Sequence, residues 1–149
     1  MPTVTLDAAD RQILTALAGN ARISMADLGR LIGMSAQSAA DRLRRLEDLG
    51  VISGYKVELD SAALGLGVGA YIRVRPAMGE LPRVAALLAD IPEIVECDRV
   101  TGDDCFIAKV FVARIEELER VIDRLLPYAQ TNTSVIQSSP VRRRAPKIA

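Results

Sequence analysis

The sequence predicts an α+β chain of two domains, a helical first domain followed by one in which strands and helices alternate in the order βαββαβ. From residue 7 to residue 49 apolar residues recur at the spacing of helices, and beyond residue 64 strand and helix spacings alternate. Half of the 149 residues are hydrophobic and 3% are aromatic, as expected for compact domains with aliphatic cores. We place the helical domain at 1–52, a strand and linker at 53–66, the second domain at 67–140 and a basic tail at 141–149.

Three helices are expected in the first domain, and each begins at a residue that can cap it. They span about 7–18, 24–32 and 35–49, and Gly33 stands where a glycine in the left-handed conformation ends a helix. After them, apolar and polar residues alternate from Val51 to Leu59, which predicts a short strand. The residues expected to face the core from the first two helices are Ile13, Leu14, Leu17, Leu28, Leu31 and Ile32.

The second and third helices are separated by the tight turn Gly33–Ser35, which predicts a helix-turn-helix. In such a unit the second helix lies in the major groove of DNA while the first crosses the backbone. One side of the third predicted helix carries Ala36, Ala39, Ala40, Leu43 and Leu46. The other side is polar, and the candidate DNA-contacting residues are Ser35, Gln37, Ser38, Asp41, Arg42, Arg44 and Arg45. The alternative is an amphipathic helix whose charged face is simply solvated.

The residue types in this set predict different roles. Gln37 and Ser38 are expected to reach base edges, because a glutamine side chain can pair with adenine through two hydrogen bonds. Arg42 is expected to address guanine or phosphate. Arg44 and Arg45 are expected to hold phosphates.

The charge balance limits how tightly one copy of this domain can bind DNA. The chain has no net charge, since 19 Lys and Arg balance 19 Asp and Glu, and so lacks an overall attraction to phosphate. Residues 1–60 contain seven basic and eight acidic residues. Asp41 lies on the DNA-facing side and is expected to pair with Arg44 or Arg45, or else to accept from cytosine N4. We expect a second copy to be needed, because two linked contacts raise the apparent affinity.

The second domain is expected to fold as a ferredoxin-like sandwich, an antiparallel sheet with both helices on one face. The other face would stay uncovered, so we expect a homodimer that buries it. The basic tail carries Arg142, Arg143, Arg144 and Lys147 and is expected to be a mobile terminus. The expected elements are strands at about 67–75, 93–100, 105–113 and 131–138 and helices at about 79–90 and 114–126.

Composition disfavours several classes of function. The chain contains no histidine, which removes the usual general base and the commonest transition-metal ligand. Cys97 and Cys105 are spaced like neither a redox pair nor a zinc site and are expected to be free thiols. Residues 1–6 do not resemble a signal peptide, and no apolar run is long enough for a membrane span. We therefore expect a cytoplasmic protein that is not an enzyme and uses no cofactor or metal.

The sequence resembles the Lrp/AsnC, or feast/famine, family of transcription regulators over nearly its whole length. The resemblance is carried by LDAADRQILTALAGNARISMADLGRLIGMSAQSAADRLRRLEDLGVISGYKVELD and by IPEIVECDRVTGDDCFIAKV. It implies a winged N-terminal DNA reader joined to an effector-sensing domain that dimerises through its sheet, with dimers often assembling into octamers. It also implies an effector that is an amino acid or a related small metabolite.

The resemblance places the effector in a cleft between dimers, lined by the turn between the second and third strands and by the last strand. The positions concerned are Thr101, Gly102, Asp103, Asp104, Cys105, Thr131 and Thr133. Asp103 or Asp104 can pair with an ammonium group, and the threonine hydroxyls can hold a carboxylate. Asp104 and Cys105 depart from the family, which commonly has an aromatic residue and a second acid there. Apart from the resemblance, TGDD is an ordinary hairpin turn.

Two other functions fit parts of the pattern. Sirohaem decarboxylases resemble the same family in both halves, but they rely on histidine, which this chain lacks. The third interpretation is a ligand sensor that has lost DNA binding and acts as the partner of a similar chain.

Overall fold

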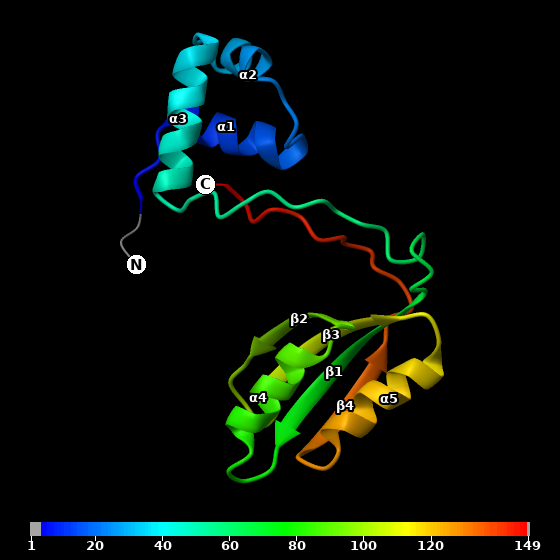
Figure 1. The fold of residues 1–149 in the computed structure, drawn as a ribbon. Coiled ribbons are helices and arrows are strands. Elements are labelled where there is room, and N and C mark those ends of the chain that lie inside the picture. Colours follow the sequence, from blue (N-terminus) through cyan, green and yellow to red (C-terminus); the bar gives the residue numbers. More distant parts are fainter. Residues whose placement is uncertain (1–3, 149) are drawn as a thin grey trace. The chain divides into compact units, whose positions relative to one another are not determined.

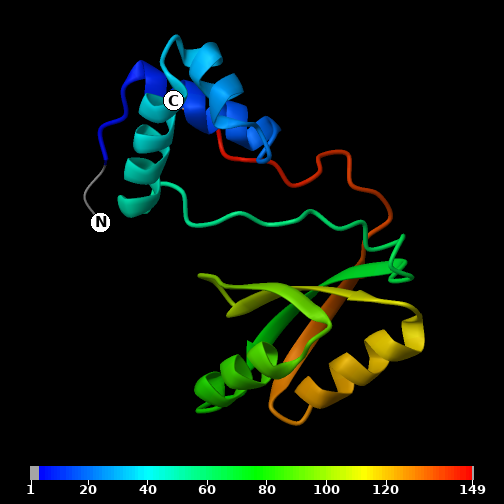
Figure 2. The ribbon, with the colours of Figure 1, turned by 45° about the horizontal axis from the view of Figure 1, so that its top comes forward.

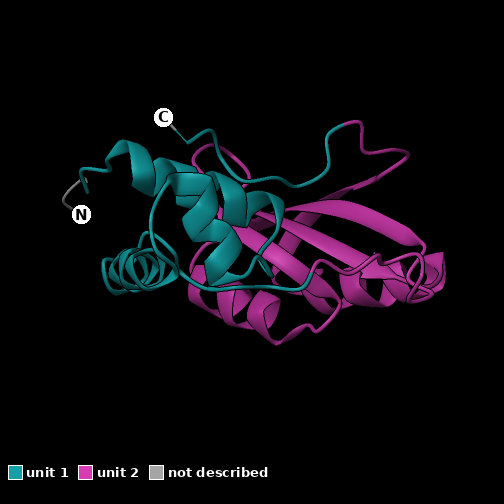
Figure 3. Cartoon of the chain, turned by 90° about the horizontal axis from the view of Figure 1, so that it is seen from above, with its two compact units in different colours: residues 1–57, 141–149 teal, residues 58–140 magenta. Residues whose placement is uncertain are grey.

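The computed structural model describes residues 4–148 of the chain. The chain separates into two compact units (Figure 3). The helical unit comprises residues 1–57 together with 141–149, and the α/β unit comprises residues 58–140. None of the helices within the described residues is long and apolar enough to cross a membrane.

The described part of the helical unit contains α1 (Ala8–Gly19), α2 (Met25–Ile32) and α3 (Ala36–Asp48) (Figure 1). As the sequence predicts, each helix follows a capping residue whose side chain accepts a backbone N–H. These caps are Asp7, Ser24 and Ser35. The core of the unit is formed by side chains with no exposed surface, namely Ile13, Leu28, Ala39 and Leu46.

The connection between α2 and α3 depends on two glycines. Gly33 ends α2 in the left-handed conformation, with a φ of 69°, as predicted. Gly29 is buried inside α2, and a Cβ atom there would lie 2.7 Å from the backbone oxygen of Met34 and 3.0 Å from the carbonyl carbon of Ser35. Gly29 therefore lets α2 approach the turn more closely than a larger residue would.

The α/β unit has the predicted order βαββαβ and a four-stranded antiparallel sheet with the strand order β2-β3-β1-β4. Figure 2 shows both helices of the unit on one face of the sheet, so the fold is the expected ferredoxin-like sandwich. The elements are β1 (Val68–Pro76), α4 (Leu81–Asp90), β2 (Ile94–Arg99), β3 (Phe106–Val112), α5 (Ile115–Leu125) and β4 (Ala129–Val135).

Burial alternates along the two central strands, as the pleat of a sheet requires. The buried residues that face the helices are Ala70, Ile72, Val74, Phe106, Ala108, Val110 and Val112. They pack against Val84, Leu88, Leu118, Val121 and Leu125. The uncovered face presents the exposed β1 residues Tyr71, Arg73 and Arg75. One face of the sheet therefore holds the core, and the other carries charged side chains together with the aromatic ring of Tyr71.

The segment Val51–Leu59 does not form the expected strand. Tyr55 Oη donates to Glu47 Oε1 at 2.8 Å, but the side chains of Val57 and Leu59 are 82% and 65% exposed. A strand needs a neighbouring strand for its backbone N–H and C=O groups, and none pairs with this segment within residues 4–148. The described part of the helical unit is accordingly built from helices without strands.

Leu31 also differs from its prediction, because 58% of its surface is exposed. The buried side of α2 is centred between Leu28 and Gly29. Leu31 lies about 110° around the helix from that centre. The apolar stripe of α2 is therefore narrower than the sequence indicates.

Candidate functional site

The first two turns of α3 carry exposed polar side chains that contact one another. Ser35 Oγ accepts from the backbone N–H of Ser38 at 3.1 Å and lies 2.9 Å from Ser38 Oγ. Gln37 Nε2 donates to Asp41 Oδ1 at 3.1 Å. The predicted pairing of Asp41 with Arg44 is present at 3.6 Å. All of these side chains are exposed, so a nucleic acid can reach them along this part of α3.

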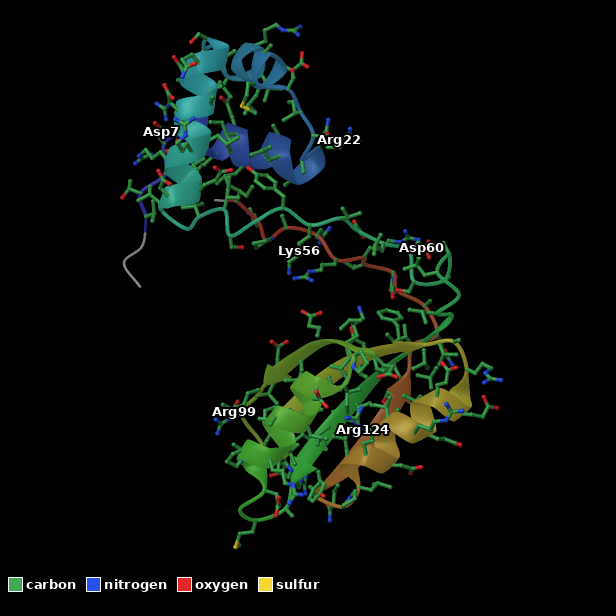
Figure 4. All side chains as sticks on the ribbon, in the orientation of Figure 1. Asp7, Arg22, Lys56, Asp60, Arg99 and Arg124 are labelled. Carbon is green, nitrogen blue, oxygen red and sulfur yellow. The ribbon has the colours of Figure 1, made fainter. Side chains whose placement is uncertain are left out.

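Arg42 points toward α1, which differs from its expected position on the DNA-facing side. Its Nη1 donates to Asp7 Oδ2 at 2.7 Å and to Asp10 Oδ1 at 2.9 Å. Figure 4 labels Asp7, which lies just before α1 and beside α3. The side chain of Arg42 is 31% exposed and that of Asp10 is 1% exposed. Arg42 is therefore engaged in holding α3 against α1.

Asp10 is the centre of this cluster of charges. It accepts from Arg42, from Arg45 Nη1 at 3.4 Å and from the backbone N–H of Asp7 at 3.2 Å. The backbone N–H of Asp10, and then the guanidinium of Arg42, hold the pKa of Asp7 below its ordinary value. Hydrogen bonds to Asp7 and Asp10 raise the pKa of Arg42. The carboxylate of Asp7 and the guanidinium of Arg42 are therefore charged at neutral pH.

A second group of charged residues lies on the uncovered face of the sheet. Arg75 Nε donates to the backbone oxygen of Asp103 at 3.0 Å, and Arg75 Nη2 lies 3.6 Å from Asp103 Oδ2 and 3.7 Å from Asp104 Oδ1. Arg73 Nε lies 3.9 Å from Asp104 Oδ2, and Arg73 Nη2 donates to Asn132 Oδ1 at 2.9 Å. The two acids of the TGDD turn are thus each beside an arginine of β1.

This group borders an open hollow of about 360 Å³. Its lining residues are Arg73, Arg75, Asp104, Gln130, Thr131 and Asn132. They offer guanidinium, carboxylate and amide groups within one small volume. Such a set can bind a small molecule that carries charges of both signs.

The structure gathers some of the predicted effector residues at this hollow and leaves others apart. Asp104 and Thr131 line it, and Asp103 joins it through Arg75. In the sheet Thr133 pairs with Ile72 and Thr131 pairs with Val74, both fully buried. Both threonines therefore share the helix-covered face, although Thr131 also borders the hollow and Thr133 does not. The remaining predicted residues lie on the turn or behind it, with Thr101 and Gly102 exposed and Cys105 packed against the core.

Sequence reasoning missed Arg73 and Arg75. The signal for them was present, since the period of two along β1 places them on the same face as Tyr71. The sequence does not reveal how β1 pairs with β3 and β4. That pairing brings the two arginines to the TGDD turn and to Asn132. Among the described residues no cluster of three or more Cys, Asp or Glu side chains is arranged to hold a metal ion.

Two family models match the chain. A model described as winged helix-turn-helix DNA-binding matches residues 6–53. A model described as the Lrp/AsnC ligand binding domain matches residues 69–146. Together they cover both units, including the candidate residues of α3 and the hollow on the sheet.

Similar proteins extend over nearly the whole chain. The HTH-type transcriptional regulator YezC of Bacillus subtilis is 37% identical over 134 residues, which are 90% of this chain and 95% of that protein. The solved structure of LrpC from the same species superimposes with a TM-score of 0.88 at 34% identity, covering 94% of this chain and 100% of that one. A transcriptional regulator of Neisseria meningitidis, solved as a complex with L-Met, has a TM-score of 0.85 at 25% identity and covers 94% of each chain.

A helix-turn-helix followed by a ligand-binding domain of this fold defines a DNA-binding transcription regulator. The chain belongs to the Lrp/AsnC family of these regulators. The relatives described above are themselves named as transcriptional regulators.

Proposed function

We propose that this regulator reads DNA sequence through the start of α3 and that a small zwitterionic ligand, an amino acid in the first instance, modulates its binding. The observation that carries the first part is the set of exposed polar side chains at the start of the second helix of a helix-turn-helix, namely Ser35, Gln37, Ser38 and Asp41. The residues at the start of that helix are the ones that reach base edges in the major groove.

Within α3 we assign different roles to the candidate residues. Gln37 and Ser38 contact base edges. Ser35 caps the helix and offers its hydroxyl to a phosphate. Arg44 and Arg45 hold phosphates. The pair of Arg44 with Asp41 is exposed on both sides, where such pairs are weak and phosphate can replace the carboxylate. The Arg45 side chain is 54% exposed beside the buried Asp10, so it can contact a phosphate while it keeps that carboxylate. Asp41 orients Gln37 through the hydrogen bond between them, and Arg42 positions α3 without contacting a base.

The hollow on the sheet is the proposed effector site. The Neisseria meningitidis relative was solved with L-Met, and this hollow offers complementary groups for the two charges of such a molecule. Arg73 and Arg75 can take a carboxylate, and Asp103 or Asp104 can take an ammonium group. Thr131 and the exposed turn residues Thr101 and Gly102 complete the proposed site, while Cys105 and Thr133 support it from the covered side.

The uncovered face of the sheet is proposed to pack against a second copy of the chain. This gives a homodimer that can assemble further to an octamer. Lys109 Nζ lies 5.6 Å from the ring centroid of Tyr71 and 5.4 Å from that of Phe111. These aromatic rings supply the apolar area that an interface core needs. The alternating exposed residues Val57 and Leu59 offer an unpaired backbone to the same partner. We further propose a cytoplasmic location and no catalytic activity.

Selection of duplexes from a random-sequence pool tests the DNA-reading proposal. We expect an enriched sequence that the protein binds at least tenfold more tightly than a scrambled duplex in fluorescence anisotropy at physiological salt. Q37A and S38A are expected to reduce that preference and to leave binding to the scrambled duplex unchanged. Q12A, which alters an exposed glutamine of α1, is the matched control and is expected to bind like the wild type. Selection that enriches no sequence contradicts the proposal.

A further inference from the structure

The zero net charge of the chain hides two units of opposite charge. The helical unit, residues 1–57 with 141–149, contains eleven Lys and Arg against six Asp and Glu, a net charge of +5. The α/β unit, residues 58–140, contains eight Lys and Arg against thirteen Asp and Glu, a net charge of −5. The unit that carries the helix-turn-helix is therefore basic, in contrast to the first 60 residues taken by themselves.

The arginines of α2 and α3 do not account for that positive charge. Each of them is beside an acid of the same unit: Arg30 with Asp27, Arg42 with Asp7 and Asp10, Arg44 with Asp41, and Arg45 with Asp10. Arg11 of α1 also has an interaction partner. To bind a phosphate, each of these arginines must leave its carboxylate partner or share itself between the carboxylate and the phosphate. Their contribution to DNA affinity is reduced accordingly.

The excess charge comes mainly from residues 141–148, which we call the basic segment. It contains Arg142, Arg143, Arg144 and Lys147 and no acid, so it supplies four of the five net charges of its unit. All four side chains are exposed. Within residues 4–148 no carboxylate lies in ion-pair contact with any of them. The segment belongs to the same compact unit as the helix-turn-helix (Figure 3).

We infer that the basic segment is a second DNA-contacting element, which binds backbone phosphates and does not read base sequence. This inference rests on the DNA-binding function proposed above. A segment of eight residues reaches up to roughly 26 Å when extended, and each strand of the duplex presents one phosphate for about every 3.4 Å of the helix axis. The segment is therefore long enough for its three arginines to meet separate phosphates. Specificity stays with α3, and the basic segment supplies salt-dependent affinity.

The acidic α/β unit of a second copy is the competing partner for the same charges. It carries the −5 charge described above, but that charge is spread over 83 residues, and several of its acids already face arginines of their own unit. A DNA duplex presents one negative charge for about every 1.7 Å of its axis. The duplex is the more concentrated anion, and so we assign the basic segment to it.

The test is the full-length variant R142Q/R143Q/R144Q, measured by anisotropy over a series of salt concentrations. Each lost phosphate contact is expected to lower the slope of log K against log salt by about 0.9. We therefore expect a slope smaller by up to about 2.7, and affinities for the selected and the scrambled duplex that fall by the same factor, tenfold or more. The ratio of the two affinities is expected to stay unchanged.

Two further variants serve as matched controls. R142K/R143K/R144K keeps the charges and is expected to retain the wild-type slope. R99Q/R114Q/R120Q removes three exposed arginines from the α/β unit and is also expected to leave the slope unchanged. Equal slopes for the wild type and R142Q/R143Q/R144Q overturn the inference. So does a loss of binding that accompanies a smaller particle mass in light scattering, because the segment then contacts a second copy. A wild type that binds no duplex instead overturns the proposed function itself.

Discussion

Arg42 of α3 donates to Asp10 of α1 over 2.9 Å, and the Asp10 side chain that receives it is almost fully buried, at 1% exposure. A buried carboxylate is tolerated when its oxygens are paired and hydrogen-bonded. Asp10 meets this condition through Arg42, Arg45 and the backbone N–H of Asp7. The relationship joins the helix proposed to read DNA to the first helix of the unit by charge as well as by apolar packing.

Replacing Arg42 is therefore expected to affect folding before it affects base recognition. In R42Q the buried carboxylate of Asp10 loses its shortest side-chain partner, so the melting temperature in calorimetry is expected to fall. DNA affinity is expected to fall for selected and scrambled duplexes alike, because α3 is no longer held in place. R42K, which keeps the charge, is expected to recover part of the melting temperature and part of the DNA affinity.

R44Q is the control for this prediction. The pair that Arg44 forms with Asp41 is exposed on both sides, so its removal is expected to change the free energy of unfolding by less than about 0.5 kcal/mol. If R42Q instead melts like the wild type and loses only its preference for the selected duplex, Arg42 reads a base and the positioning role is wrong.

Gly29 is expected to tolerate no side chain. A methyl group there would stand 2.7 Å from the backbone oxygen of Met34, and backbone cannot move aside as a flexible side chain can. G29A is therefore expected to destabilise the helical unit by about 1–3 kcal/mol, the usual range for overpacking. Urea unfolding followed by circular dichroism measures the change.

G19A is the matched variant for Gly29. Gly19 is also helical, but a Cβ atom at that position would meet nothing within 4 Å. Alanine is the better helix former, so G19A is expected to be neutral or slightly stabilising. Equal stabilities of G29A and G19A would mean that α2 is not held close to the turn.

The comparison of Gly29 with Gly33 shows what can be predicted from sequence in this unit. Gly33 was predictable because a helix end is a local pattern of cap, apolar spacing and glycine. The same holds for the caps Asp7, Ser24 and Ser35. Gly29 was not predictable, because its necessity arises from a backbone that approaches it from the next element. The strand expected at Val51–Leu59 was wrong for a related reason, since pairing depends on a partner that periodicity does not identify.

The charged groups around Arg42 and Arg73 likewise depend on partners that local sequence patterns do not identify. The period of α3 places Arg42 on the polar side, but in the structure its side chain turns to Asp7 and Asp10, which are 35 and 32 residues away along the chain. Arg73 is likewise 59 residues from Asn132. The order βαββαβ predicted the sheet and the uncovered face. It did not predict which charges meet on that face, because this depends on the register of β1 with β3 and β4.

The acid sensitivity of the helical unit is expected to depend in part on Asp7. The folded state holds the pKa of Asp7 below its ordinary value of 3.8, first through the backbone N–H of Asp10 and then through Arg42. Because the pKa of Asp7 is lower in the folded state, the unfolded state binds the proton more readily. The ionised Asp7 therefore stabilises the fold fully above pH 3.8, and this stabilisation is lost as the pH falls through the folded-state pKa.

D7N isolates this effect, because asparagine caps a helix as well as aspartate does but carries no charge. We expect D7N to melt below the wild type at pH 6, and the difference in melting temperature to shrink as the pH falls below 3.8. D90N, which removes an exposed acid paired with Arg124 in the other unit, is the control and is expected to show a small difference from the wild type. A difference for D7N that does not change with pH would show that the charge of Asp7 contributes nothing to folding.

The effector site is expected to reveal itself by ligand-induced stabilisation. An amino acid that binds the folded chain raises its stability by about 2.7 kcal/mol at a concentration one hundred times its dissociation constant. The common amino acids, with L-Met among them, are therefore screened by thermal shift. At least one of them is expected to raise the melting temperature. R75Q is expected to abolish that shift, because Arg75 is proposed to take the ligand carboxylate and also holds the TGDD turn through the backbone oxygen of Asp103.

D104N and T133V separate the parts of this proposal. D104N is expected to weaken the shift, since an amide cannot pair with an ammonium group as a carboxylate does. T133V is expected to leave the shift unchanged, because Thr133 lies on the helix-covered face opposite Ile72 and is not one of the residues that line the hollow. R83Q, which removes an arginine stacked on Tyr128 at 4.0 Å from the ring centroid, controls for the general loss of one positive charge. If T133V abolishes the shift while R75Q retains it, the ligand lies on the covered side of β4 and the hollow beside Arg73 and Arg75 is not the effector site.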